Sequence, residues 1–225
     1  MKILDDISLD IPEDLGEEFL KKLMGGNIND TLLKMLDDLR GACISNIKPV
    51  ICYDIFEITK IKDIKVYFSS GDIFEGPNIS KILEGSKKAA IFILTLGGKY
   101  EDFINSKKDD GDYLSTIVLD AISTNLLTIL GKYTNDLLRK IGISQKGWGS
   151  TCSYSPGQYK WTIEEQSKIF SMIDAQKIGV SLTDSSLMVP FFSASGVYGF
   201  GPKDEIDKTR VACDLCPRED CIGRR

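Results

Sequence analysis

The longest stretch of helical periodicity in the chain runs from about residue 112 to residue 141. Apolar side chains recur there every three or four positions, and mostly polar side chains lie between them. A single apolar stripe of this length is typical of a helix that rests with one face on a core. The pattern therefore predicts a long helix lying on a sheet. Its stripe consists of Leu114, Ile117, Val118, Ala121, Ile122, Leu126, Ile129, Leu130, Tyr133 and Leu137.

Shorter helices are expected in four other places. Their ranges are about 13–25, 30–44, 79–83 and 162–173. Pro12 suits the opening turn of the first helix, and Gly25-Gly26 is a stop signal at its end. Thr162 followed by Glu165 matches the capping box, a pattern in which both side chains bond the backbone at a helix start.

The central strand of the sheet is predicted by the apolar run from Ala89 to Leu96, which is continuous rather than alternating. Such a run suits a strand that is covered on both faces, and Gly97-Gly98 ends it. In the segment from Val50 to Ile58 the alternation shifts phase near Ile55 and Phe56, which indicates a β-bulge. Further strands are expected at residues 65–68, 178–182 and 193–200.

The order of these elements favours an α+β fold with a mainly antiparallel sheet over regular βαβ winding. Composition agrees with a soluble globular protein, because 42% of the 225 residues are hydrophobic and 27% are charged. A chain of this length and composition can bury a sizeable core.

Charge and residue usage exclude several function classes. The chain has 28 basic and 33 acidic residues, a formal net charge of −5 and no histidine. Imidazole zinc sites and Ser-His or Cys-His nucleophile pairs are therefore excluded. No concentrated basic face is visible, which argues against a nucleic-acid partner. The acidic N-terminus lacks the apolar run of a signal peptide and no stretch approaches a membrane span, so we expect a cytoplasmic protein without a membrane partner.

Two segments carry candidate chemistry. Residues 148–161 contain both tryptophans and two tyrosines among small residues, which fits either a ligand-binding loop or a surface loop anchored by aromatic side chains. Residues 178–190 and 193–199 are rich in hydroxyl groups and include Asp184. These hydroxyls can face a cleft at strand ends, or the segment can be a strand followed by an Asx-type turn and a proline-limited edge.

In this order, the two segments resemble a known family. Pro156-Gly157 with the helix after it, then Ile178-Gly179-Val180 and the run from Ser193 to Gly196, are similar to the activation domain of cobalamin-dependent methionine synthase. The chain is most similar to the stand-alone form that accompanies corrinoid methyltransferases. The resemblance covers roughly residues 10–200 and is strongest over 153–199.

The resemblance implies a helmet-shaped α+β domain over residues 1–202, with a mainly antiparallel twisted sheet and packed helices, followed by a Cys-rich tail over residues 203–225. Such a domain is an activation subunit. It binds S-adenosylmethionine in a shallow site and caps the corrinoid (cobalamin) of a partner, either a corrinoid-binding protein or a methyltransferase subunit. An electron donor such as flavodoxin or ferredoxin reduces the cobalt, and the methyl group of S-adenosylmethionine traps the product.

The resemblance also implies the cofactor-binding residues. They are Ser153, Ser155, Pro156, Gly157, Gln158, Tyr159 and Tyr198. The family has an arginine at the position of Ser153 and a tyrosine at that of Gln158. A serine cannot form a bidentate charged pair with a carboxylate, which makes Lys160 the candidate substitute. An acidic contact of the family falls near Thr128 on the long helix.

The last candidate is a cluster of cysteines in the tail. Cys213 and Cys216 can reach one metal from a tight turn, and Cys221 can close toward it, with Cys152 as one possible fourth ligand. Zinc, an iron–sulfur cluster, a redox thiol pair and reduced spectator thiols all fit this spacing. An iron–sulfur cluster would give electrons a point of entry.

Three functions therefore remain in view. The first is an accessory protein for the reductive, S-adenosylmethionine-dependent remethylation of a corrinoid-dependent methyltransferase. The second is a corrinoid-binding or capping module without S-adenosylmethionine, which the residues at positions 153 and 158 favour. The third is an electron-transfer protein that uses the cysteine tail.

Overall fold

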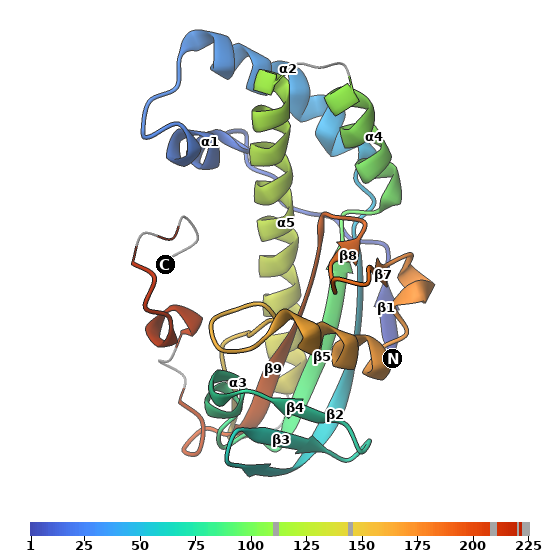
Figure 1. Cartoon of the computed structure of the whole chain (residues 1–225), viewed down its shortest axis with the longest axis vertical. Helices are drawn as coiled ribbons and strands as arrows, with labels where there is room; N and C mark the ends of the chain where they lie inside the picture. Colours follow the sequence, from blue (N-terminus) through green and yellow to red (C-terminus); the bar gives the residue numbers. More distant parts are fainter. Residues whose placement is uncertain (110–112, 144–145, 208–210, 220, 222–225) are drawn as a thin grey trace.

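An antiparallel sheet forms the centre of the computed structural model, which describes residues 1–109, 113–143, 146–207, 211–219 and 221 (Figure 1). Seven strands of the described residues form this sheet: six in the order β4-β3-β2-β5-β9-β6, and β1, which pairs with β2 on the edge opposite β5. These strands are β1 (Lys2–Leu4), β2 (Val50–Lys62), β3 (Lys65–Phe68), β4 (Ile73–Glu75), β5 (Lys88–Thr95), β6 (Trp148–Ser150) and β9 (Ser193–Pro202). Strands β7 (Ser181–Leu182) and β8 (Met188–Val189) form a separate hairpin. The α+β class and the antiparallel sheet are confirmed.

The helices divide between the two ends and faces of the sheet. They are α1 (Glu17–Leu23), α2 (Asp30–Asn46), α3 (Pro77–Ile82), α4 (Gly98–Asp109), α5 (Tyr113–Gly142) and α6 (Gln166–Met172), with short 3₁₀ turns η1 (Ile163–Glu165), η2 (Ala175–Ile178) and η3 (Ala212–Leu215). Helices α1, α2 and α4 gather around the start of α5, while α3 lies with β3 and β4 at the other end (Figure 1).

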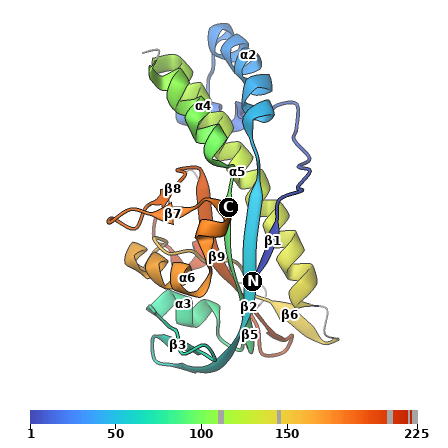
Figure 2. The same cartoon turned by 90° about the vertical axis from the view of Figure 1, so that its right-hand side faces the viewer.

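Strand β5 lies between two hydrophobic layers. Ala90, Phe92 and Leu94 face the layer that contains α5, whereas Ile91 and Ile93 face the layer that contains α3 and α6. Figure 2 shows α5 on one side of the sheet and α3, α6 and the β7–β8 hairpin on the other. Because both faces of β5 are covered, its consecutive residues are all apolar rather than alternately apolar and polar. The prediction of a central strand is confirmed.

Helix α5 is the long helix that the periodicity predicts. Its length and composition alone would allow it to cross a membrane. In this structure Val118, Ile122, Leu126 and Leu130 of its apolar stripe are fully buried in the α5 layer of the core, whereas Leu114 and Tyr133 are exposed. The stripe is therefore used for packing on the sheet and on α1 and α2.

Several predicted details are wrong. No bulge lies at Ile55 and Phe56, because β2 pairs with β5 without interruption from Val50 to Glu57. The alternation shifts there because both faces of β2 are buried at residues 51–53 and less covered further on. The register irregularity lies instead between Ile58 and Lys60, where β2 pairs with β3.

Element boundaries differ in two other places. Helix α1 begins at Glu17 rather than at Glu13, after turns in which Leu15 and Glu17 bond the carbonyls of Pro12 and Asp14. The strand expected at 178–182 is reduced to β7, because residues 175–178 form η2. Strands β1, β4, β6 and β8 and helix α4 were not expected from the sequence, since these strands are only two or three residues long and α4 is largely polar.

The contact between the end of α5 and β9 gives a test of this packing. A methyl group at Gly142 would lie 2.0 Å from the buried ring of Phe200, whereas one at Gly131 of the same helix would meet no atom within 4 Å. Gly142→Ala should therefore lower the free energy of unfolding by about 1–3 kcal/mol through overpacking. Gly131→Ala should raise it by roughly 0.5–1 kcal/mol, because alanine favours the helix.

Urea unfolding of both variants and the parent chain measures these effects. If Gly142→Ala were as stable as Gly131→Ala, the close packing of α5 on β9 would be wrong.

Candidate functional site

The loop between β6 and η1 is joined to the sheet through Tyr154. Its backbone N–H donates to the Val197 carbonyl at 3.0 Å, and the Val197 N–H donates back at 2.9 Å. The Tyr154 ring stacks on Trp161 at 5.9 Å between centroids, and both side chains are buried. The Pro-Gly loop and the hydroxyl-rich strand are therefore neighbours in space, as the resemblance requires.

The turn at Pro156-Gly157 is closed by its own residues. Gly157 has φ +86°, a left-handed conformation that favours glycine, and its N–H donates to the Trp161 carbonyl at 2.9 Å. The Gln158 side-chain oxygen accepts from the Ser155 N–H at 3.0 Å. Gln158 thus stabilises the turn. The sequence had indicated it only as a cofactor-binding residue.

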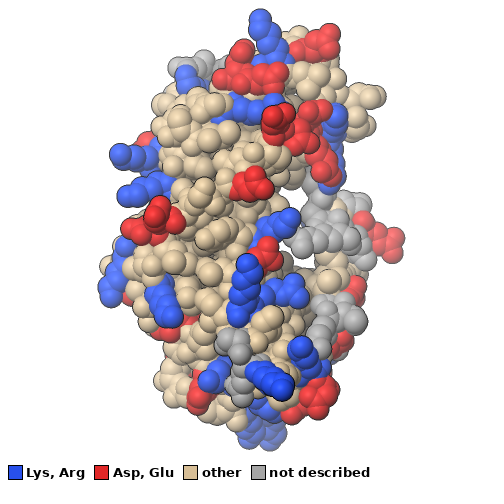
Figure 3. Space-filling view, turned by 180° about the vertical axis from the view of Figure 1, so that it is seen from behind, with Lys and Arg blue, Asp and Glu red and all other residues tan. Residues whose placement is uncertain are grey.

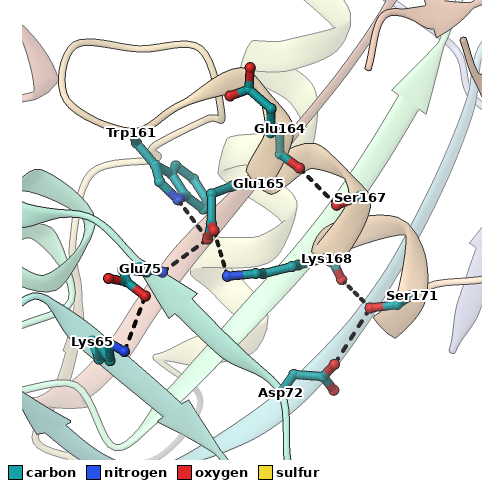
Figure 4. A network of polar contacts seen from close by, with 9 residues as sticks. All are labelled: Lys65, Asp72, Glu75, Trp161, Glu164, Glu165, Ser167, Lys168 and Ser171. Atoms are coloured by element: carbon teal, nitrogen blue, oxygen red, sulfur yellow. Dashed lines mark hydrogen bonds and ion pairs between the residues drawn. The ribbon is translucent and has the colours of Figure 1, made fainter. Parts of the chain in front are cut away.

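Glu165 ties this loop to the β3–β4 hairpin (Figure 4). One carboxylate oxygen accepts from the Glu75 backbone N–H at 2.9 Å and from the Trp161 indole N–H at 3.3 Å, and the other oxygen pairs with Lys168. Thr162 makes no side-chain hydrogen bond to the helix backbone. The helix is confirmed, but the capping box is wrong, because the Glu165 carboxylate is used for these tertiary contacts.

The predicted cofactor residues line three neighbouring cavities. The helix cavity, of about 490 Å³, has Ser153 and Tyr198 in its wall together with Lys132, Asp136 and Arg139 of α5. The serine cavity, of about 270 Å³, is lined by Ser155 and Pro156 together with parts of α6, the β7–β8 hairpin and β9. The tail cavity, of about 470 Å³, has Gly157, Gln158 and Tyr159 on one side and the tail on the other.

The helix cavity carries charges of both signs. Lys132, Asp136 and Arg139 follow one another at spacings of four and three residues, so one face of α5 presents them together. Arg139 Nε donates to the Ser150 hydroxyl at 3.2 Å. Seen from behind, the molecule has Lys and Arg side chains gathered near the middle of the face, with acidic groups among them (Figure 3).

Two residues that the resemblance singled out, Thr128 and Lys160, do not line this cavity. Thr128 is exposed and its hydroxyl donates to the Thr124 carbonyl, while the acidic residue of the cavity wall is Asp136, two turns further along α5. Lys160 lies elsewhere, with its ammonium 5.3 Å from the centroid of the Tyr159 ring. The guanidinium of Arg139 lies in the same cavity wall as Ser153.

The serine cavity contains a buried amide with an unused donor. Gln166 is 1% exposed and its Oε1 accepts from the Ser195 hydroxyl at 2.9 Å. Its Nε2 has no hydrogen-bond partner among the described residues. A buried polar group without a partner costs about 1–3 kcal/mol, so this amide is a candidate ligand contact.

The cysteines fall into two groups. Burial raises the pKa of the Cys43 thiol to about 11 and that of the Cys52 thiol to about 12, so both are core residues that stay protonated near neutral pH. Cys213, Cys216 and Cys221 all line the tail cavity, whereas Cys152 lines the helix cavity. Wherever the structure describes the chain, no three His, Cys, Asp or Glu side chains are arranged to hold a metal ion.

The tail lies against the candidate site. The N–H of Cys216 donates to the Cys213 carbonyl at 3.1 Å, which makes the tight turn expected for this pair. Ala212 and Leu215 of η3 pack on the same hydrophobic layer as Tyr154 and Trp161. The tail thiols therefore face the loop from Gly157 to Tyr159 across the tail cavity.

Comparison with solved structures identifies the fold. The chain is similar to the structure titled "Crystal Structure of the MetH Reactivation Domain bound to AdoHcy", with a TM-score of 0.57 and 17% sequence identity over 88% of this chain and 70% of that chain. The chain has an activation-domain-like fold. No family model and no curated protein matches the sequence.

Within this activation-domain-like fold, the cavity-lining side chains of the helices were not expected from the sequence. Lys132, Asp136 and Arg139 are polar positions between the apolar residues of α5, and charged residues are ordinary on the solvated part of a helix. Their spacing of four and three residues, which places them on one face of the helix, was the only sequence feature that could have indicated this cluster. Gln166 carried no signal, because its burial depends on the contacts of α6 with β9.

The Glu165 contacts predict a specific loss of stability. Glu165→Ala removes the acceptor of the Glu75 N–H and the Trp161 indole, and it should lower the free energy of unfolding by about 2–3 kcal/mol, since hydrogen bonds to a charged group are the stronger ones. Glu164→Ala, next to it on the exposed side, is the control and should change stability little.

Urea unfolding followed by tryptophan fluorescence provides the measurement. Equal unfolding midpoints for the two variants would show that Glu165 does not hold the loop.

Proposed function

We propose that this protein is an accessory protein for the reductive activation of a corrinoid-dependent methyltransferase of the methionine synthase type, and that it works in the cytoplasm. The observation that carries the proposal is the fold, which is similar to a reactivation domain bound to AdoHcy. We further propose that the helix cavity binds S-adenosylmethionine. Its volume of about 490 Å³ lies in the range of ordinary ligand sites.

The charges of the helix cavity suit the amino-acid end of this ligand. That end carries a carboxylate and an ammonium group. Arg139 offers a planar guanidinium for the carboxylate, and Asp136, on the same face of α5, offers a carboxylate for the ammonium. Ser153, at the position of the family's arginine, lies in the same wall and needs only to provide one hydrogen bond.

The protein contributes position rather than reactive groups. In the proposed reaction, the partner's cobalt, reduced by one electron from cob(II) to cob(I), attacks the methyl group and releases S-adenosylhomocysteine. The electron comes from a separate donor such as flavodoxin or ferredoxin. Holding the methyl donor over the corrinoid makes the transfer effectively unimolecular, which is a large part of what such a domain can supply.

Ligand binding tests this assignment. Arg139→Gln should weaken the binding of S-adenosylmethionine about tenfold or more, because it removes a charge-assisted hydrogen bond. Lys140→Gln makes the same change of charge on the next residue, which does not line the cavity, and should leave the affinity unchanged. Calorimetry with the full chain measures both.

Absence of binding to the parent chain at millimolar concentration would remove the methyl-transfer role and favour the capping module instead. The visible spectrum of partner-bound cob(II)alamin, followed with electron donor and S-adenosylmethionine, then reports whether this chain promotes methylation of the cobalt.

We propose, second, that Cys213, Cys216 and Cys221 bind zinc or an iron–sulfur cluster. The observation in favour is that the three residues line one cavity, with the first two joined by a tight turn. Their side chains are not arranged around a common point, so binding requires the tail to adjust, and we assign no step of the activation to this site.

Metal analysis of anaerobically purified protein tests the cysteine proposal. We expect about one zinc per chain in a colourless product, or iron and sulfide in a brown one, and loss of the metal in the Cys213→Ser, Cys216→Ser double variant. Cys152→Ser is the control, because Cys152 lines the helix cavity. A metal-free parent chain would contradict the cysteine proposal.

A further inference from the structure

The serine cavity is a formed site between three parts of the chain. Ser155 and Pro156 come from the loop, Gln166 from α6, and Ser193 and Ser195 from β9. The loop is fixed to β9 through Tyr154, and α6 is fixed to β9 through the bond from Ser195 to Gln166. The volume of about 270 Å³ admits a short side arm of a ligand but not a large ring.

The polar groups of this cavity define what it can bind. Gln166 lines the cavity, and its Nε2 is a buried donor without a partner among the described residues, so an acceptor such as a carbonyl oxygen on a ligand that reaches it would satisfy this donor. Nearby hydroxyl oxygens, including those of Ser155 and Ser186, can accept a hydrogen bond from the ligand in return. One carbonyl acceptor beside one N–H donor is the pattern of a carboxamide.

The cavity also selects against charge. Its described lining contains no Lys, Arg, Asp or Glu side chain, so a buried carboxylate would lack a counter-ion. Leu187 and Phe191 at its rim are 54% and 67% exposed, which offers apolar surface to whatever carries the arm. These features fit a neutral carboxamide on a short apolar arm that projects from a larger apolar body.

We propose that the serine cavity binds a carboxamide side arm of the partner's corrinoid. This inference rests on the proposed function. A corrin ring carries short arms that end in carboxamides around an apolar macrocycle, which matches both the cavity and its exposed rim. The cavity thus fixes the rotation of the ring against this protein, while the helix cavity holds the methyl donor.

Binding of free corrins to the full chain tests the proposal. The probes are dicyanocobinamide, whose arms end in carboxamides, and dicyanocobyrinic acid, whose arms end in carboxylates, at a salt concentration that screens the net charge of the protein. The parent chain should bind the amide form about tenfold more tightly. Gln166→Met keeps the length and helix propensity of the side chain and should weaken binding of the amide form about five- to tenfold.

Ser171→Ala, on the exposed part of the same helix, is the matched control and should bind as the parent chain does. Gln166→Leu is the second variant, and thermal unfolding verifies that each variant is folded. Equal affinity of the parent chain for the two corrins, or unchanged affinity of folded Gln166 variants for the amide form, overturns the proposal.

The two proposals can fail separately. If the parent chain does not bind dicyanocobinamide at all, the carboxamide site is wrong. The proposed function then stands if this chain still promotes methylation of the partner's cobalt, and it falls as well if the partner's spectrum does not respond.

Discussion

Strand β5 has apolar side chains on both of its sides, and the rest of the structure depends on covering both. The long helix α5, with α1, α2 and α4, buries one side. Helices α3 and α6 bury the other, together with the loop between β6 and η1, which we call the aromatic loop. Burial of this kind is the dominant favourable term in folding. It also fixes where the cavities lie, because β9 pairs with β5 along its length and carries residues of two cavity walls, Ser195 and Tyr198.

The aromatic loop combines the two interpretations that its sequence allows. Tyr154 and Trp161 are anchors, stacked on each other and buried, while Tyr159 between them is 41% exposed. Asn78 of α3 donates to the Tyr159 carbonyl at 2.8 Å and to the Tyr154 hydroxyl at 3.2 Å. A loop held at this many points can present backbone and side chains in one fixed arrangement, which is the condition for a preorganised binding site.

The three cavities around the aromatic loop offer different chemical groups to a ligand. The helix cavity has the charges for a zwitterionic ligand, the serine cavity has neutral polar groups, and the tail cavity has thiols. An arrangement of this kind would let one small domain position a methyl donor and a macrocycle at the same time. In the proposed site, Arg139 of α5 would supply the positive charge that the resembling family has at the position of Ser153.

The sequence by itself determined the α+β class, the long helix, the central strand and the loop and strand of the candidate site. These features follow from local periodicity and from the order of a few motifs, which a chain carries whatever its tertiary contacts. The sequence did not determine the roles of Arg139, Gln166, Gln158 and Glu165. Their functions depend on which distant backbone or side chain each one meets, and an exposed arginine or a helical glutamine looks ordinary until the tertiary structure brings its partners beside it.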